Sequence, residues 1–236
     1  MSRLEGRVVA IAGAGGGLGP AVARRLAEEG ATLGLTDRAQ ELLDSVVADL
    51  GLGEDRVDAR AVDLLDPSAA ADWAQALDQR FGRVDGLLHL VGGWKGGEPI
   101  ESFDLADYEL LHDLLVRTVQ QTSRAFHGPL TASGRGRFVL VSSSAAQRPE
   151  GSNAAYAATK SAAEAWTLAL ADSFAGSGAT ANVLVVNAIL TPAMREKNPD
   201  KEYPNFTSVE DIADALAFIC SDSAEKMNGQ RFALHP

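Results

Sequence analysis

The chain is predicted to form an α/β fold, a three-layer doubly wound parallel sheet built by a single domain over residues 1–236. Short apolar runs alternate with amphipathic segments along the chain, as strands alternate with helices in such folds. Alanine and glycine are abundant and aromatic residues make up only 6%, which suits helices packed closely on a parallel sheet. No repeat, low-complexity segment or linker divides the sequence.

Seven apolar segments are strand candidates, at residues 8–11, 31–36, 57–62, 86–91, 137–141, 182–186 and 230–234. Helices are expected at residues 20–29, 39–50, 67–80, 104–127, 153–175 and 208–222. Asp66 followed by Pro67 is a favourable helix start, because aspartate caps the first turn and proline is tolerated in it. Ser208 is a second favourable cap. The irregular stretch 191–206 carries three prolines and follows a strand's carboxyl end, so we expect a substrate lid there.

Composition narrows the function classes. The net charge of −11 opposes binding to nucleic-acid phosphates, so no nucleic-acid partner is expected. The single cysteine, Cys220, excludes an internal disulfide, is expected to pack in the core, and fits a cytoplasmic location. Residues 1–7 lack the apolar run of a signal peptide, and no apolar stretch approaches the roughly 20 residues of a membrane helix. We expect neither a membrane partner nor a metal.

A glycine-rich turn, Ala12-Gly13-Ala14-Gly15-Gly16-Gly17-Leu18-Gly19, joins the first predicted strand to the first predicted helix. Glycines at this spacing allow a sharp turn, bring backbone N–H groups close to a pyrophosphate, and let the helix pack tightly on the strand. Pro20 costs little, because a first-turn amide has no partner within the helix. The turn therefore predicts a dinucleotide site at the positive end of the helix.

Asp37 ends the second predicted strand, roughly 20 residues after the glycine-rich turn, where an acidic side chain binds the adenosine ribose. A carboxylate accepts hydrogen bonds from a free 2′-hydroxyl and repels a 2′-phosphate. NAD is therefore favoured over NADP. NADP stays the alternative, because the guanidinium of neighbouring Arg38 can pair with that phosphate.

Tyr156 and Lys160 are four residues apart in a predicted helix and so share one face of it. A free tyrosine has a pKa of about 10, and work as an acid or base near neutrality requires a pKa lower by about 3 units. A nearby ammonium favours the phenolate. Ser143 lies just past the fifth predicted strand, where its hydroxyl can bind the same substrate oxygen as Tyr156. Each motif alone also arises by chance.

Taken together, these motifs resemble the short-chain dehydrogenase/reductase family along nearly the whole chain. The resemblance rests on residues in the family's order and spacing, namely Gly13-x-x-x-Gly17-Leu18-Gly19, Asp37, Asp63-Leu64, Ser143, Tyr156 and Lys160. It implies a Rossmann-like seven-stranded sheet and an NAD(P)-dependent oxidoreductase that transfers hydride between a nicotinamide cofactor and an alcohol or ketone. It also implies a homo-oligomer, a tetramer or dimer, assembled through the helices at 104–127 and 153–175.

By the same resemblance Tyr156 is the general acid/base, Lys160 binds the nicotinamide ribose and lowers the pKa of the tyrosine, and Ser143 orients the substrate. The implied cofactor-binding residues are Gly13, Gly15, Gly16, Gly17, Leu18, Gly19, Asp37, Asp63, Leu64, Leu90, Val91, Gly92, Tyr156, Lys160, Ile189 and Thr191. Of these, Asp63 and Leu64 would contact adenine. Ile189 and Thr191 would meet the nicotinamide carboxamide.

Three positions depart from the family pattern. His89-Leu90-Val91-Gly92 stands where Asn-Asn-Ala-Gly is usual, Leu115 replaces a helix asparagine that relays protons, and Val186-Asn187 replaces Pro-Gly. His89 and His112 are the nearest histidines that could substitute in the proton path, although packing or surface roles are favoured. The departures keep a second reading open, a catalytically weakened dinucleotide-binding sensor or scaffold subunit.

The substrate pocket is the least informative part of the sequence. By resemblance it is lined by residues 93–95, 147–150 and the lid at 193–206. Arg148, Arg195 and Lys197 suggest an anionic substrate, but lid charges usually face water. The expected substrate class is a 3-oxoacyl thioester or a small or cyclic ketone.

Overall fold

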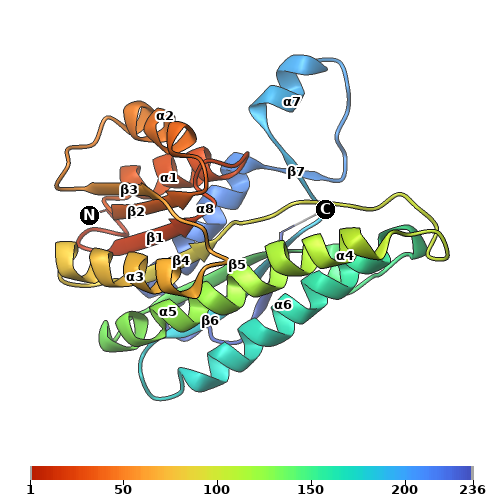
Figure 1. Cartoon of the computed structure of the whole chain (residues 1–236). Coiled ribbons are helices and arrows are strands. Elements are labelled where there is room, and N and C mark those ends of the chain that lie inside the picture. Colours follow the sequence, from red (N-terminus) through yellow and green to blue (C-terminus); the bar gives the residue numbers. More distant parts are fainter. Residues whose placement is uncertain (1, 235–236) are drawn as a thin grey trace.

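The central sheet has seven parallel strands in the spatial order β3-β2-β1-β4-β5-β6-β9. The computed structural model describes residues 2–234. Its sheet strands are β1 (Val8–Ala12), β2 (Thr32–Asp37), β3 (Val57–Ala61), β4 (Gly86–His89), β5 (Arg137–Ser143), β6 (Thr180–Val186) and β9 (Arg231–Ala233). The strand order reverses between β1 and β4, which confirms the predicted doubly wound sheet and places a ligand crevice at the carboxyl ends of these strands (Figure 1).

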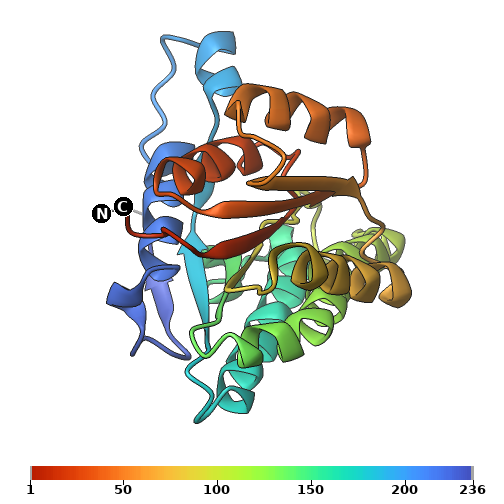
Figure 2. The same ribbon diagram turned by 90° about the vertical axis from the view of Figure 1, so that its left-hand side faces the viewer.

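Helices cover both faces of the sheet, giving three layers (Figures 1 and 2). One face carries α1 (Gly19–Glu28), α2 (Gln40–Leu50) and α8 (Val209–Ile219). The other face carries α3 (Pro67–Phe81), α5 (Thr118–Ala132) and α6 (Ala154–Ser173), and α4 (Leu105–His112) packs on α6. The inner strands β1, β5 and β6 are rich in apolar residues because both of their faces are buried, whereas the edge strands β3 and β9 are partly exposed.

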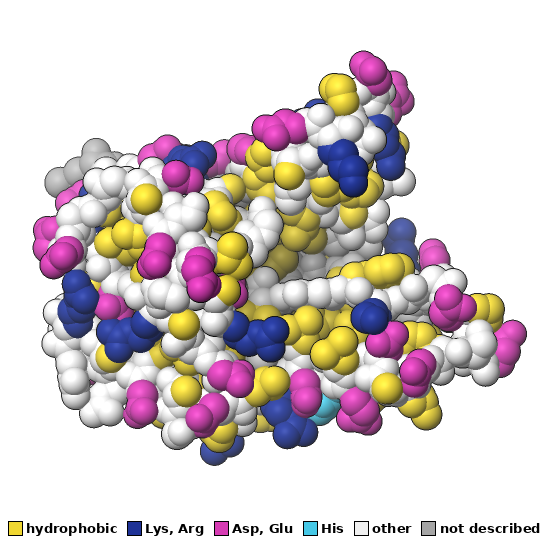
Figure 3. Space-filling view, turned by 45° about the horizontal axis from the view of Figure 1, so that its top comes forward, with side chains coloured by type: hydrophobic (Ala, Val, Ile, Leu, Met, Phe, Trp, Pro, Cys, Tyr) yellow, Lys and Arg dark blue, Asp and Glu magenta, His cyan; other side chains and the backbone are white. Residues whose placement is uncertain are grey.

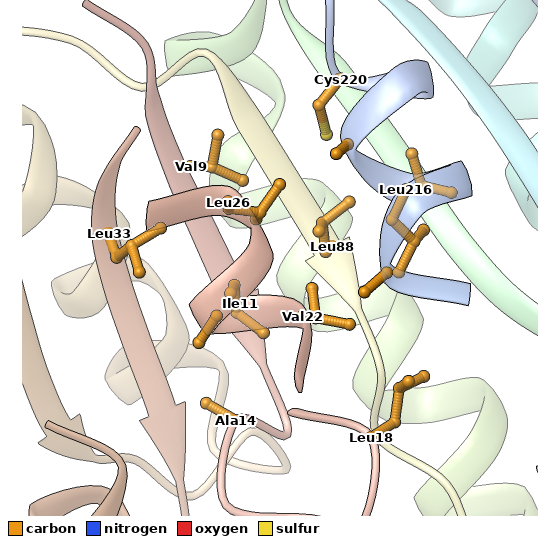
Figure 4. Close-up of a cluster of buried hydrophobic side chains, with 14 of the residues drawn as sticks. Val9, Ile11, Ala14, Leu18, Val22, Leu26, Leu33, Leu88, Leu216 and Cys220 are labelled. Carbon is orange, nitrogen blue, oxygen red and sulfur yellow. The ribbon is translucent and has the colours of Figure 1, made fainter. Parts of the chain in front are cut away.

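Two apolar clusters fill the spaces between the layers. In the first, Val22 and Leu26 of α1 and Leu216 of α8 converge on the sheet beside Leu88 of β4 (Figure 4). Cys220 follows α8 in the same cluster and is buried, as expected of a core residue. This packing fixes α1, and with it the glycine-rich turn, against the sheet.

The helix predicted at 104–127 is interrupted and longer than expected. A π-helical turn, Asp113–Arg117, separates α4 from α5, and α5 continues through Pro129 to Ala132. Proline removes one hydrogen bond of the helix, but Leu130, one turn after Phe126, is fully buried. Burial of the helix face that bears Phe126 and Leu130 therefore outweighs the lost hydrogen bond, and the helix continues beyond the proline.

Two further segments differ from the predictions. β5 extends to Ser143, so the serine lies on the last residue of a strand rather than beyond it. The irregular stretch 191–206 contains a short helix, α7 (Pro192–Lys197), and is closed at its base by the pairing of β7 (Ala188–Leu190) with β8 (Phe206–Ser208). Figure 1 shows α7 standing away from the sheet.

The predicted caps are confirmed. Asp66 Oδ1 accepts a hydrogen bond from Ser68 N at 2.8 Å, and Ser208 Oγ accepts one from Asp211 N at 3.1 Å. No helix within residues 2–234 has the length and apolar character to span a bilayer. In the same residues no group of three or more His, Cys, Asp or Glu side chains is arranged to hold a metal.

Candidate active site

A cavity of about 890 Å³ crosses the carboxyl ends of the strands. Its lining begins with Asp37 at the end of β2 and Asp63 after β3, passes the glycine-rich turn, and reaches Ser143 at the end of β5. Figure 3 shows this face hollowed below the segment that carries α7, with hydrophobic side chains in the recess. The cavity therefore lies where the sheet topology places a ligand.

The glycine-rich turn forms one wall of the cavity. Gly13 has φ +86°, and a Cβ there would lie 2.9 Å from Val91 N, so only glycine fits both the backbone conformation and the space. A Cβ at Gly19 would collide with the carbonyl of Ala14, so glycine at this position lets the first residue of α1 pack directly on the turn. Leu18 gives α1 no side-chain cap. Without that cap, the first amides of α1 remain available to another hydrogen-bond acceptor.

Asp37 is held beside that turn. Its Oδ2 accepts a hydrogen bond from Gly15 N at 3.1 Å and its Oδ1 accepts one from Arg38 N at 2.8 Å. The carboxylate is half-buried, whereas Arg38 is exposed at the rim, and both line the cavity. Of these two charged side chains, the Asp37 carboxylate is the one that hydrogen bonds hold in place at this end of the cavity.

Ser143, Tyr156 and Lys160 line the opposite end of the same cavity. The Nζ of Lys160 lies 5.9 Å from the centre of the Tyr156 ring, as expected for residues one helical turn apart. It also donates a hydrogen bond of 3.0 Å to the carbonyl of Val141 on β5. The ammonium is therefore buried and fixed, while the Tyr156 ring is half-buried.

The predicted lowering of the Tyr156 pKa by Lys160 is not found in the chain alone. Burial raises the pKa of Tyr156 above 10, and the Ser143 hydroxyl acts in the opposite direction. Burial also lowers the pKa of Lys160 to about 8, and the Glu164 carboxylate raises it. The ammonium is bonded to a carbonyl on the strand rather than to the phenol, so it does not offset the desolvation of the tyrosine.

Leu115 lies in the π-helical turn and is almost fully buried. It packs in a small apolar cluster with Ala155 and Tyr156. At this position an apolar side chain, packed against the tyrosine ring, stands where the family has asparagine.

His89 is fully buried at the end of β4 and bridges to α5. Its Nε2 lies 3.1 Å from Thr118 Oγ1 and its Nδ1 lies 3.2 Å from Thr122 Oγ1. Burial, assisted by the nearby Lys160 ammonium, lowers the pKa of His89 to about 3. The imidazole is thus a neutral brace between sheet and helix, which agrees with the packing role favoured for it. His112 is half-buried beside Asp113 and does not line the cavity.

Most of the predicted site residues are brought together. The predicted residues that line the cavity are Gly13, Gly16, Gly17, Leu18, Asp37, Asp63, Leu64, Leu90, Val91, Gly92, Ser143, Tyr156, Lys160, Ile189 and Thr191. Gly15 and Gly19 are not among the lining residues. Gly15 binds Asp37 through its N–H, and Gly19 serves helix packing.

Several residues of the site were not anticipated. Asn187, noted only as a departure, accepts a hydrogen bond from Ser144 Oγ at 2.7 Å and donates one to the carbonyl of Asn205 at 3.1 Å. It therefore ties the strand carrying Ser143 to the base of the 191–206 segment. Thr118 lines the cavity, and Glu164 lies behind Lys160. Glu164 follows Lys160 by four residues, and this spacing in the sequence could have indicated that the two side chains share one helix face.

Comparisons with known proteins agree with this geometry. A family profile described as enoyl-(acyl carrier protein) reductase matches residues 13–234. Levodione reductase from Leifsonia aquatica is 31% identical, covering 96% of this chain and 92% of that protein. A crystal structure of levodione reductase superposes with a TM-score of 0.87 at 28% identity, covering 99% and 97% of the two chains.

Two more relatives are similar over nearly their full lengths. Meso-2,3-butanediol dehydrogenase from Serratia marcescens is 30% identical, covering 96% of this chain and 92% of that protein. The crystal structure of a 3-ketoacyl-(acyl-carrier-protein) reductase from Brucella melitensis complexed with NADH has a TM-score of 0.86 at 27% identity, covering 98% of each chain. The chain belongs to the short-chain dehydrogenase/reductase family of oxidoreductases, enzymes that use NAD(P).

Proposed function

We propose that this protein is an NAD-dependent oxidoreductase that interconverts a small neutral secondary alcohol and its ketone. The observation that carries the proposal is one continuous cavity with Asp37 and the glycine-rich turn at one end and Ser143, Tyr156 and Lys160 at the other. A dinucleotide laid along it would place its adenosine near Asp37 and its reactive ring near Tyr156.

The residues present fit the cofactor. The turn packs closely on the Val91 backbone at Gly13, and neighbouring Gly16 and Gly17 line the cavity. The uncapped end of α1 supplies backbone N–H groups and the positive end of a helix dipole for the phosphates. Asp37, held by two backbone N–H groups, can accept hydrogen bonds from the adenosine ribose. Its negative charge opposes a 2′-phosphate, which supports NAD over NADP.

The bound cofactor would supply or accept the hydride. For the chain's own part, Tyr156 Oη would give a proton to the substrate oxygen during ketone reduction and take it back during alcohol oxidation. Ser143 Oγ would donate a hydrogen bond to the same oxygen. Lys160 would favour the phenolate when Tyr156 has lost its proton, because an ammonium stabilises a nearby anion. Leu115 and Ala155 exclude water from one side of the ring.

The lining supports a neutral substrate. Near Ser143 and Tyr156 the cavity is lined by apolar and amide groups, including Trp94, Leu114, Asn153 and Asn187. Lys160 is the only charged lining residue at this end. Arg148, Arg195 and Lys197 are exposed and lie outside the lining. A substrate that carries phosphate, such as a carrier-bound 3-oxoacyl thioester, would find no cation other than Lys160 in this lining. The names of levodione reductase and butanediol dehydrogenase fit the small neutral class.

The test is turnover by the purified protein with NADH and with NADPH on small cyclic ketones, diketones and 3-oxoacyl thioesters. Reduction of a neutral ketone with NADH, lost in Tyr156→Phe, is the expected result. Tyr108→Phe is the matched control, because Tyr108 packs in the same apolar cluster but lies outside the cavity lining. Turnover that survives Tyr156→Phe unchanged would remove Tyr156 from the mechanism.

A dinucleotide-binding sensor or scaffold subunit is the second candidate. It is favoured by the buried, apolar Leu115, which gives the site no polar group where relatives have a proton relay. NADH binding without turnover of any substrate in the panel would establish this candidate over the enzyme.

A further inference from the structure

A buried carboxylate lies one helical turn beyond Lys160 on α6. Glu164 is 1% exposed. Its Oε1 accepts a hydrogen bond from Ser142 Oγ at 2.7 Å, and its Oε2 accepts one from the Arg231 Nε at 2.7 Å. Three elements, α6, β5 and β9, therefore meet at one carboxylate that the reaction proposed above does not use.

Glu164 and Lys160 reach consecutive residues of β5. Lys160 donates to the Val141 carbonyl and Glu164 accepts from the Ser142 side chain. The next residue of the strand is Ser143. Because residues four apart share one face of a helix, these two contacts fix the ridge that also bears Tyr156 against the strand that bears the serine.

The carboxylate also acts on the charge of Lys160. The ammonium is buried and bonds to a carbonyl, and Glu164 is the group that raises its pKa against burial. The other titratable groups facing it are Tyr156 on α6 and His89 on β4, which is neutral. Asp113 and Arg117 on the π-helical turn are half-exposed and pair with each other at 3.1 Å.

Arg231 balances the carboxylate from the other side. It lies on β9, the edge strand of the sheet, and its side chain is 42% exposed. Its positive charge offsets part of the field that Glu164 exerts at Lys160. We infer that Glu164 is a positioning residue that keeps Lys160 charged and in place for the reaction, with Arg231 tempering its effect.

Substitutions of Glu164 and Arg231 should shift the pH dependence of the reaction in opposite directions. Ketone reduction is expected to fall at alkaline pH as Lys160 loses its proton. Glu164→Gln removes the negative charge, so Lys160 loses its proton more readily and this alkaline limb moves to lower pH. A movement of about one unit lowers kcat roughly tenfold on the limb and leaves the acid side of the profile little changed. Arg231→Gln moves the limb to higher pH, because the carboxylate then acts on Lys160 unopposed.

Asp58→Asn is the matched control. Asp58 has a side chain 7% exposed and pairs with two arginines that are each 40% exposed, Arg60 at 2.7 Å and Arg80 at 2.9 Å, so it is likewise a buried carboxylate held by half-exposed guanidinium groups. It lies on β3, at the opposite edge of the sheet. The control variant is expected to lose stability and to keep the wild-type pH profile and KM.

The activity readout rests on the proposed function, so NADH binding is measured across the same pH range by fluorescence. If the wild-type protein shows no turnover, the proposed function is refuted. The pH dependence of NADH binding then still tests the role of Glu164. Shifts of opposite sign in the two variants, absent in Asp58→Asn, would support the inference. The inference would be overturned if neither the alkaline limb of the activity profile nor the NADH binding curve moved in the variants. It would also be overturned if both variants shifted the limb in the same direction. If Glu164→Gln does not fold, the half-exposed Arg231→Gln carries the test alone.

Discussion

Replacing Gly13 by alanine is expected to weaken both the fold and dinucleotide binding. Its φ of +86° costs an alanine about 1–2 kcal/mol. The added Cβ would lie 2.9 Å from Val91 N and 3.0 Å from the Leu90 carbonyl carbon. Both are backbone atoms at the end of β4, so the strand end must move, at a further cost of about 1–3 kcal/mol. The free energy of unfolding should therefore fall by roughly 2–5 kcal/mol.

Gly82→Ala separates the two causes. Gly82 has φ +74° and nothing within 4 Å of its added Cβ, so it bears the conformational cost without the collision. Urea denaturation measures stability and fluorescence titration measures NADH affinity. Because Leu90 and Val91 line the cavity, Gly13→Ala should weaken NADH binding at least about tenfold, or 1.4 kcal/mol. Gly82→Ala should leave it unchanged. Equal stability losses with equal NADH affinity would refute the reasoning.

Three more predictions concern pH, cofactor choice and assembly. His89 has a pKa of about 3 in the folded protein, whereas the imidazole of the unfolded chain titrates near 6.5. Between these pH values the unfolded chain binds the proton and the folded protein does not, so the free energy of unfolding decreases as the pH falls, by up to about 1.4 kcal/mol per pH unit. His89→Asn should flatten the slope of stability against pH, measured by urea titrations between about pH 4 and 6.5, and an unchanged slope would contradict the buried neutral state. Asp37→Ala should weaken NADH and strengthen NADPH relative to it, and an unaltered ratio of affinities would remove Asp37 from cofactor selection. A groove of about 530 Å³ lies between α5 and α6 and is lined by Trp166, Ala169 and Leu170. We expect copies of the chain to contact each other there, so Ala169→Arg should convert an oligomer to a monomer, as measured by light scattering. A wild-type protein that is already a monomer would refute this prediction.

Local patterns predicted most of the architecture. The strands were found because parallel strands buried on both faces are continuous apolar runs. The four-residue spacing of Tyr156 and Lys160 predicted their shared helix face, whereas the roles of these two residues and of Ser143 were implied by the resemblance to the family and remain predictions. The Tyr156–Lys160 spacing is a local signal, because the two residues are one helical turn apart.

What could not be predicted depends on contacts distant in sequence. The π-helical turn holds the buried Leu115, which packs with Ala155 of α6, and helix propensity does not distinguish this turn from its flanking turns. Glu164 is 22 residues from Ser142 and 67 from Arg231, so in sequence it looked like one more helix charge. The raised pKa of Tyr156 reflects burial, which only the assembled site reveals.

The bond between Arg231 and Glu164 also bears on local motion of the sheet. Arg231 lies on the edge strand β9, and its guanidinium neutralises a carboxylate buried in the middle of the protein. If β9 separated briefly from β6, Glu164 would lose this cation while remaining buried next to Lys160. Fraying of one short strand at the rim of the sheet is therefore coupled to the charge balance around Lys160.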